Sequence, residues 1–144
     1  MLISHVLRDK GDIVHALPES ATIEQAAKEL HMRKVGALVI LNEAGHVTGV
    51  LSERDIVREI ARRGAAGLAE RVASAMTRMV VTASPLESID DGLGRMTDRR
   101  IRHLPVLDDS HRLIGIVSIG DLVKHRIAVV EAEAAAMQAY IATG

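Results

Sequence analysis

Apolar and polar residues follow one order along the chain, and that order occurs twice. After Thr22, residues 23–35 carry apolar side chains at three- and four-residue steps, which is typical of a capped amphipathic helix. Two apolar runs joined by a turn at residues 42–45 follow and predict a β-hairpin. A second helical pattern then begins at Ser52. With a short strand before the first helix, each set predicts strand, helix, hairpin and helix.

A shift of 66 residues aligns residues 13–60 with residues 79–126 without a gap. Nine of the 48 aligned pairs are identical, whereas composition alone gives about three. Two copies of one supersecondary unit account for this agreement. We therefore expect an α/β (α+β) fold of two tandem β-α-β-β-α repeats, packed as a pseudo-two-fold pair, with an extended C-terminal helix.

The repeat divides the chain into five segments. They are a lead segment 1–12, a first repeat 13–63, a connector 64–78, a second repeat 79–126 and a helix extension 127–144. The last helix has apolar residues at three- and four-residue steps well past the repeat, and such a stripe requires a surface to pack against. We expect a homodimer through this stripe; the alternative is that the helix folds back on its own repeats.

Composition excludes several classes of function. The net charge is −1 and the only aromatic residue is Tyr140, so a nucleic-acid interface built on basic charge and base stacking is not expected. The chain has no cysteine, hence no disulfide or thiolate chemistry. No signal peptide is indicated, and the apolar run 35–41 is too short to span a bilayer. We expect a cytoplasmic protein that binds neither nucleic acid nor membrane.

The motif Ser-x-x-Asp opens the last helix of both copies, as "GVLSERD" and as "GIVSIGD". One interpretation is structural: the serine caps the helix, and the aspartate three residues on accepts the serine amide, as in a capping box. The other is functional, because a helix start suits phosphate and a carboxylate can accept hydrogen bonds from two ribose hydroxyls. The two roles are compatible.

The motifs together resemble the CBS domain, named after cystathionine β-synthase. They are "GVLSERDIV" and "GIVSIGDLV", with "RIRHLPVLD" before the second and "MTRMVVTASP" at the start of the second copy. Two tandem copies resemble the CBS pair, or Bateman module, and the chain resembles a stand-alone CBS-pair protein. The resemblance implies a regulatory module, not an enzyme, that binds an adenosine-containing ligand between its repeats. AMP is the first expectation, with ADP, ATP, NAD(H) and S-adenosylmethionine as alternatives, and the effector protein is unknown.

The resemblance also implies which residues bind. The ribose would be held by the two signature pairs, Asp121 with Ser118 and Asp55 with Ser52. Arg102 and His103 match positions that bind phosphate in relatives. Apart from the resemblance, Arg54 at the start of a predicted helix and Lys10 in the lead segment are further phosphate candidates. Aliphatic side chains and strand backbone would enclose the base: Val80, Val81, Thr82, Val14, Leu104, Pro105, Ala37 and Leu38.

The two copies differ where phosphate is expected. The second has Arg102-His103 where the first has Gly36-Ala37, so we expect the Asp121 site to bind phosphate better. Alternatively, these basic residues form an ordinary solvated face. Pro105 lacks an amide proton and therefore indicates an edge or distorted strand.

No set of residues indicates catalysis or metal binding. The seven histidines lack ligand spacing, and no nucleophile elbow or P-loop is present. Two other functions stay open. One is a protein-interaction or structural module whose Ser-x-x-Asp motifs are only caps, and the other, less favoured, is an enzyme acting on a nucleotide.

Overall fold

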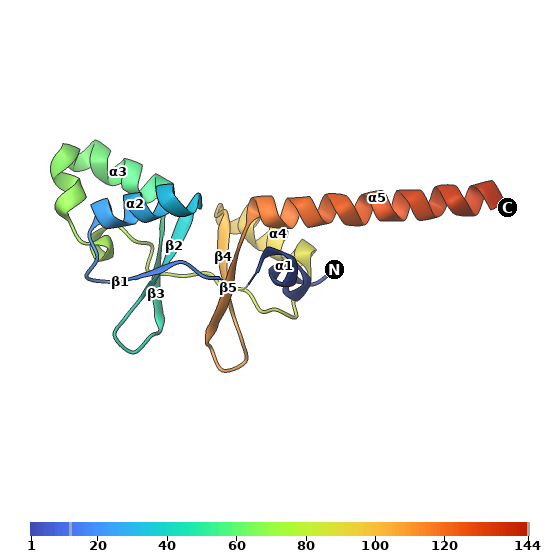
Figure 1. The fold of residues 1–144 in the computed structure, drawn as a ribbon, viewed down its shortest axis with the longest axis horizontal. Helices are drawn as coiled ribbons and strands as arrows, with labels where there is room; N and C mark the ends of the chain where they lie inside the picture. Colours follow the sequence, from blue (N-terminus) through green and yellow to red (C-terminus); the bar gives the residue numbers. More distant parts are fainter. Residues whose placement is uncertain (12, 144) are drawn as a thin grey trace. The chain divides into compact units, whose positions relative to one another are not determined.

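The computed structural model describes residues 1–11 and 13–143 and divides into two compact units. One unit consists of residues 13–81, and the other joins residues 1–12 to residues 82–144. Asp12 and Gly144, at the ends of the predicted lead segment and helix extension, lie outside the described residues. Each unit contains one copy of the predicted repeat (Figure 1).

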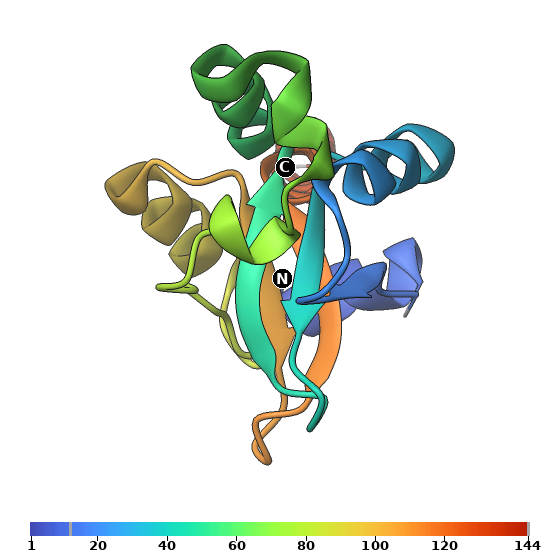
Figure 2. The same ribbon diagram turned by 90° about the vertical axis from the view of Figure 1, so that its left-hand side faces the viewer.

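The unit 13–81 has the predicted order of elements. A parallel strand, a helix, a hairpin and a second helix are followed by two short 3-10 helices: β1 (Ala16–Pro18), α2 (Ile23–Arg33), β2 (Ala37–Leu41), β3 (Val47–Ser52), α3 (Glu53–Arg63), η1 (Gly64–Ala69) and η2 (Val72–Ser74). The sheet order is β1-β2-β3, with β1 parallel and β3 antiparallel to β2. Helices α2 and α3 lie away from the hairpin turn in both views (Figures 1 and 2).

The second unit repeats this arrangement with one strand fewer. Its elements are α1 (Ile3–Lys10), α4 (Ile89–Arg99), β4 (His103–Leu107), β5 (Leu113–Ser118) and α5 (Ile119–Thr143). Strands β4 and β5 form a two-stranded antiparallel sheet. The predicted fold class and the tandem repeats are therefore confirmed, but helix α1 was not predicted.

Pro105 explains the missing third strand. In the unit 13–81, the amide of Val39 donates to the carbonyl of His15 (3.2 Å) and helps pair β1 with β2. The aligned residue of the other unit is Pro105, which has no amide proton to donate. Within the described residues, this place is taken by an isolated parallel bridge between Ala83 and Val106. The predicted edge strand at Pro105 is thus confirmed.

Equivalent chain segments cover the two units. The first covering segment, residues 70–77, is fixed by the amide of Val72 donating to the carbonyl of Ala21 (2.8 Å). The second covering segment, residues 1–8, is fixed in the same way by Ile3 donating to Glu87 (2.9 Å). The lead segment is therefore an integral part of the unit that contains the second repeat.

Both covering segments place one apolar side chain over a glycine of the hairpin. A Cβ added at Gly49 would lie 2.4 Å from the sulfur of Met76, and one added at Gly115 would lie 2.5 Å from Cδ2 of Leu7. Close packing therefore requires glycine at both positions, which belong to the two signature motifs. This accounts for the glycine that the motifs share.

Helix α5 extends well beyond the elements on which it packs. The helix is 25 residues long. Its first turns contact α4 and α1, and its later turns extend past them (Figure 1). The predicted apolar stripe is exposed in the single chain, at 52% for Ile127, 66% for Met137 and 69% for Ile141. Among the described residues, no helix has the length and apolar character needed to cross a membrane.

Candidate functional site

Both Ser-x-x-Asp motifs form the predicted capping box. In α3, Asp55 Oδ2 accepts the amide of Ser52 (2.9 Å), and Ser52 Oγ accepts the amide of Asp55 (3.3 Å). In α5, Asp121 Oδ2 accepts the amide of Ser118 (2.8 Å), and Ser118 Oγ accepts the amide of Asp121 (3.1 Å). The structural interpretation of the motif is confirmed. The cap uses Oδ2 of each carboxylate, and Oδ1 takes no part in it.

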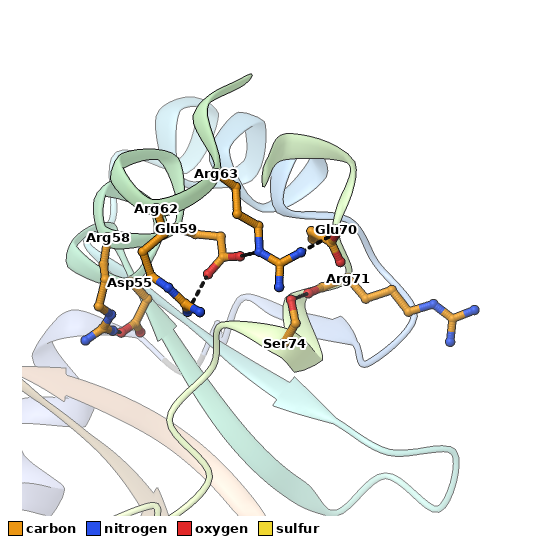
Figure 3. A network of polar contacts seen from close by, with 8 residues as sticks. All are labelled: Asp55, Arg58, Glu59, Arg62, Arg63, Glu70, Arg71 and Ser74. Atoms are coloured by element: carbon orange, nitrogen blue, oxygen red, sulfur yellow. Dashed lines mark hydrogen bonds and ion pairs between the residues drawn. The ribbon is translucent and has the colours of Figure 1, made fainter. Parts of the chain in front are cut away.

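The left-over oxygen of Asp55 is bound by a neighbour on the same helix. Asp55 is only 5% exposed, and its Oδ1 accepts a hydrogen bond from Nη2 of Arg58, one turn further along (Figure 3). The side chain of Arg58 is itself 61% exposed, so solvent screens the pair. Sequence reasoning did not identify Arg58, although its three-residue spacing from Asp55 is a recognisable signal.

Asp121 is paired instead with a residue from the N-terminal segment. Lys10 Nζ lies 2.6 Å from Asp121 Oδ2 and donates a second hydrogen bond to the carbonyl of Ile116 in β5 (2.9 Å). Burial raises the pKa of Asp121, but the hydrogen bonds from Lys10 and Ser118 outweigh it and lower the pKa below its ordinary value. The carboxylate is therefore ionised at neutral pH.

A further anchor lies one turn beyond each signature aspartate. Glu59 on α3 is 3% exposed and lies between two arginines, with Oε1 2.7 Å from Arg63 Nε and Oε2 3.5 Å from Arg62 Nη1 (Figure 3). The Glu59–Arg63 pair is close but not aligned as a hydrogen bond. Arg63 also pairs with Glu70 of the first covering segment (2.9 Å). This network ties α3 to its cover.

The aligned residue on α5 is His125. Its Nδ1 lies 2.9 Å from the carbonyl oxygen of Asp121, and its Nε2 lies 3.0 Å from Asp9 Oδ2 next to the second covering segment. The hydrogen bonds to the Asp121 carbonyl and to Asp9 raise the pKa of His125. His125 therefore ties α5 to α1, as Glu59 ties α3 to its cover.

The predicted phosphate-binding residues divide between the two units. Arg54 is exposed on the first turn of α3. In the other unit, the carbonyl of Arg102 accepts the amide of Ile119 (2.8 Å), and His103 pairs with Ser118 in the sheet register. The structure thus brings Arg102, His103 and Lys10 to the start of α5, where Asp121 lies.

The predicted base-pocket residues also fall on both units. Thr82, Leu104 and Pro105 belong to one unit, and Val14, Ala37, Leu38, Val80 and Val81 to the other. Leu38 and Leu104 are 0% exposed and pack in the cores of their own units, so only their backbone remains for a ligand. The carbonyl of Thr82 accepts a hydrogen bond from Arg95 (2.9 Å). Within the described part of the chain, no cluster of three or more His, Asp or Glu side chains is arranged to hold a metal.

Comparison with known proteins gives a consistent result. A sequence model described as the CBS domain matches residues 10–62 and 72–128. A curated relative, the mitochondrial CBS domain-containing protein CBSX3 of Arabidopsis thaliana, is 33% identical over 99% of this chain and 72% of its own length. The crystal structure of a CBS-domain containing protein from Agrobacterium tumefaciens is 40% identical, with a TM-score of 0.84 over 87% of this chain and 92% of that one.

A second solved structure contains a ligand. It is a CBS domain protein from Pyrobaculum aerophilum complexed with AMP, 28% identical, with a TM-score of 0.81 over 91% of this chain and 97% of that one. The matches cover both repeats, so the similarity concerns the tandem pair and not a single copy.

Proposed function

The chain belongs to the CBS-domain family, and from this premise we propose that it is a regulatory module that binds an adenosine nucleotide. One observation carries the proposal: Asp121, ionised at the start of α5, pairs with Ser118 and with the cation of Lys10, and the backbone of Arg102 contacts the same helix end. A carboxylate suits ribose hydroxyls, and nearby cations suit phosphate. His103 is a further phosphate candidate in this unit, and Arg54, on the first turn of α3, is the candidate beside Asp55.

AMP is the first ligand we propose, because a structurally similar relative is complexed with AMP. ATP and NAD(H) share its adenosine and phosphate and are the alternatives. With no phenylalanine or tryptophan in the chain, aliphatic residues would enclose the base. We expect the ribose to bind Asp121 in preference to Asp55, because Oδ1 of Asp55, which the cap does not use, already accepts a hydrogen bond from Arg58.

Calorimetric titration of the full chain with AMP, ADP, ATP, NADH and S-adenosylmethionine tests the proposal. We expect at least one nucleotide to bind and Asp121→Asn, which retains an acceptor for the cap, to weaken binding by about tenfold or more. The matched control is Asp109→Asn, an exposed turn residue. Unchanged affinity in Asp121→Asn would show that the ribose assignment is wrong.

The second candidate function is an interaction or structural module without a ligand. The observation that favours it is that both signature aspartates already have a complete cap and an ion pair. Absence of binding to all five compounds would support this alternative. We expect no turnover of a bound nucleotide, and hydrolysis or transfer detected by chromatography would instead support an enzyme.

We further propose that the exposed stripe of α5 packs against α5 of a second copy. Its members recur in the heptad spacing of a coiled coil: Val123, Ile127, Val130, Ala134, Met137 and Ile141. In a parallel pair, Arg126 of one helix faces Glu131 of the other, as the flanking positions of a heptad require. The charges beside the stripe therefore complement a second copy.

The chain has no cysteine, so single cysteines test this pairing cleanly. Met137→Cys should form a disulfide-linked dimer on mild oxidation, whereas Ala139→Cys, on the outer face, should not. A monomer in light scattering would contradict the dimer. Nucleotide binding would act by changing the geometry of the two repeats or of this dimer. We propose that it does so in the cytoplasm and that the change is transmitted to an effector protein still to be identified.

A further inference from the structure

Lys10 is the cation of the Asp121 pair, although it lies 111 residues away in the sequence. It is the last residue of α1 and contacts both the start of α5 and the backbone of β5. The side chains of Lys10 and Asp121 are 31% and 26% exposed, so the pair is partly shielded but reachable. In the other unit the cation that pairs with the equivalent aspartate is an exposed arginine of the same helix.

The pair leaves one acceptor and one donor unused. Asp121 Oδ2 accepts both Lys10 and the amide of Ser118, whereas Oδ1 accepts no hydrogen bond from any of the described residues. An ammonium group has three protons. Two point to Asp121 and to the carbonyl of Ile116, and the third has no acceptor among residues 1–11 and 13–143. Asp121 Oδ1 can therefore accept a hydrogen bond from a ligand hydroxyl, and the third ammonium proton of Lys10 beside it can bind an anion.

We propose that Lys10 is a specificity-determining residue of the Asp121 site and selects ligands that carry a phosphate next to a ribose over the uncharged nucleoside. This inference depends on the proposed function, because it assigns ribose to Asp121. The ribose hydroxyl donates to Oδ1, and a phosphate oxygen accepts the third proton of Lys10. Lys10 keeps its contacts with Asp121 and Ile116 while it binds.

The contrast with Asp55 supports a role for Lys10 in selection. Arg58 already donates to Oδ1 of Asp55, the oxygen that a ribose would need, so a ligand there must share this oxygen with the arginine or displace it. Lys10 binds the other oxygen of Asp121 and leaves the ribose position open. Of the two carboxylates, Asp121 is therefore the one whose ribose-binding oxygen has no competing donor among the described residues and whose cation binds the other oxygen.

Titration of the full chain with AMP and with adenosine tests this inference. For Lys10→Met we expect the affinity for AMP to fall by about tenfold or more, as for a lost charge-assisted hydrogen bond, and the affinity for adenosine to change by less than about threefold. Lys10→Arg should restore part of the preference. The matched control is Lys28→Met, which removes a lysine from an exposed ion pair on α2.

The outcomes distinguish the inference from the proposed function. If the wild-type chain binds both ligands and Lys10→Met weakens them equally, Lys10 only positions the carboxylate and the inference is wrong. Unchanged affinity for AMP overturns it as well. If the wild-type chain binds neither AMP nor adenosine, this inference is wrong, whereas the proposed function is overturned only if none of the five titrated compounds binds. Circular dichroism of Lys10→Met and of a second variant, Lys10→Gln, establishes that the fold is retained.

Discussion

The same helix position carries opposite charge in the two repeats, yet each repeat fastens its helix to an acidic residue in or beside its cover. Glu59 on α3 is a buried carboxylate that reaches its cover through Arg63, and the aligned His125 on α5 pairs with Asp9 beside its cover. The basic group that meets the acidic residue of the cover is Arg63, four residues after Glu59, in one repeat, and the aligned His125 itself in the other. A contact between helix and cover is therefore preserved although the aligned residues differ, because the basic group stands at a different position on each helix.

The largest effect we expect concerns the two cores. Leu38 and Leu104 are aligned and fully buried, so Leu38→Ala and Leu104→Ala should each lower the free energy of unfolding by about 2–5 kcal/mol. Hydrogen exchange should rise mainly in residues 13–81 for the first variant and mainly in residues 82–143 for the second. The exposed Leu86→Ala is the control. Equal exchange throughout the chain in both variants would show that the two units do not unfold separately.

Removing the charge of Glu59 should have the next largest effect. Glu59→Gln replaces a buried carboxylate that faces two arginines, and we expect the free energy of unfolding to fall by about 1–3 kcal/mol in urea denaturation. Glu43→Gln, in an exposed turn, is the control. A neutral result would mean that Glu59 does not hold α3 to its cover.

The two caps should contribute alike. Ser52→Ala and Ser118→Ala each remove a hydroxyl that accepts an amide at the helix start, and each should cost about 1 kcal/mol of unfolding free energy. Ser20→Ala, at an exposed position, serves as the reference in the same thermal or urea measurement. A cost confined to one cap would show that the capping boxes are not equivalent.

The smallest effect is a pH dependence of the second unit alone. Because the pKa of His125 is raised above its ordinary value of 6.5, its stabilisation is complete below that value and is lost as pH rises through the folded pKa. The partner Asp9 is exposed, so we expect a loss of at most about 1 kcal/mol between roughly pH 6 and pH 8. Urea unfolding of wild type and His125→Gln measures it. The same pH step in both proteins would assign it to another group.

Periodicity and turn residues were sufficient to predict the repeats, the hairpins and both caps, because these depend on neighbours close in sequence. Helix α1 was not predicted. Residues 1–8 cover the second unit as residues 70–77 cover the first. The 66-residue shift that aligns the two repeats does not align these two covers, because one lies before both repeats and the other lies between them. The Lys10–Asp121 pair and the partners of His125 depend on tertiary packing, which no local pattern reports.

The second covering segment also constrains the order in which the chain can fold. Residues 1–8 are synthesised before the helix and strand that they cover, which follow more than a hundred residues later, as the separation of Lys10 from Asp121 shows. The first repeat is followed directly by its own cover and can close during synthesis. The second covering segment must instead stay undocked until the second repeat has been made, so this unit is completed by residues synthesised well before it.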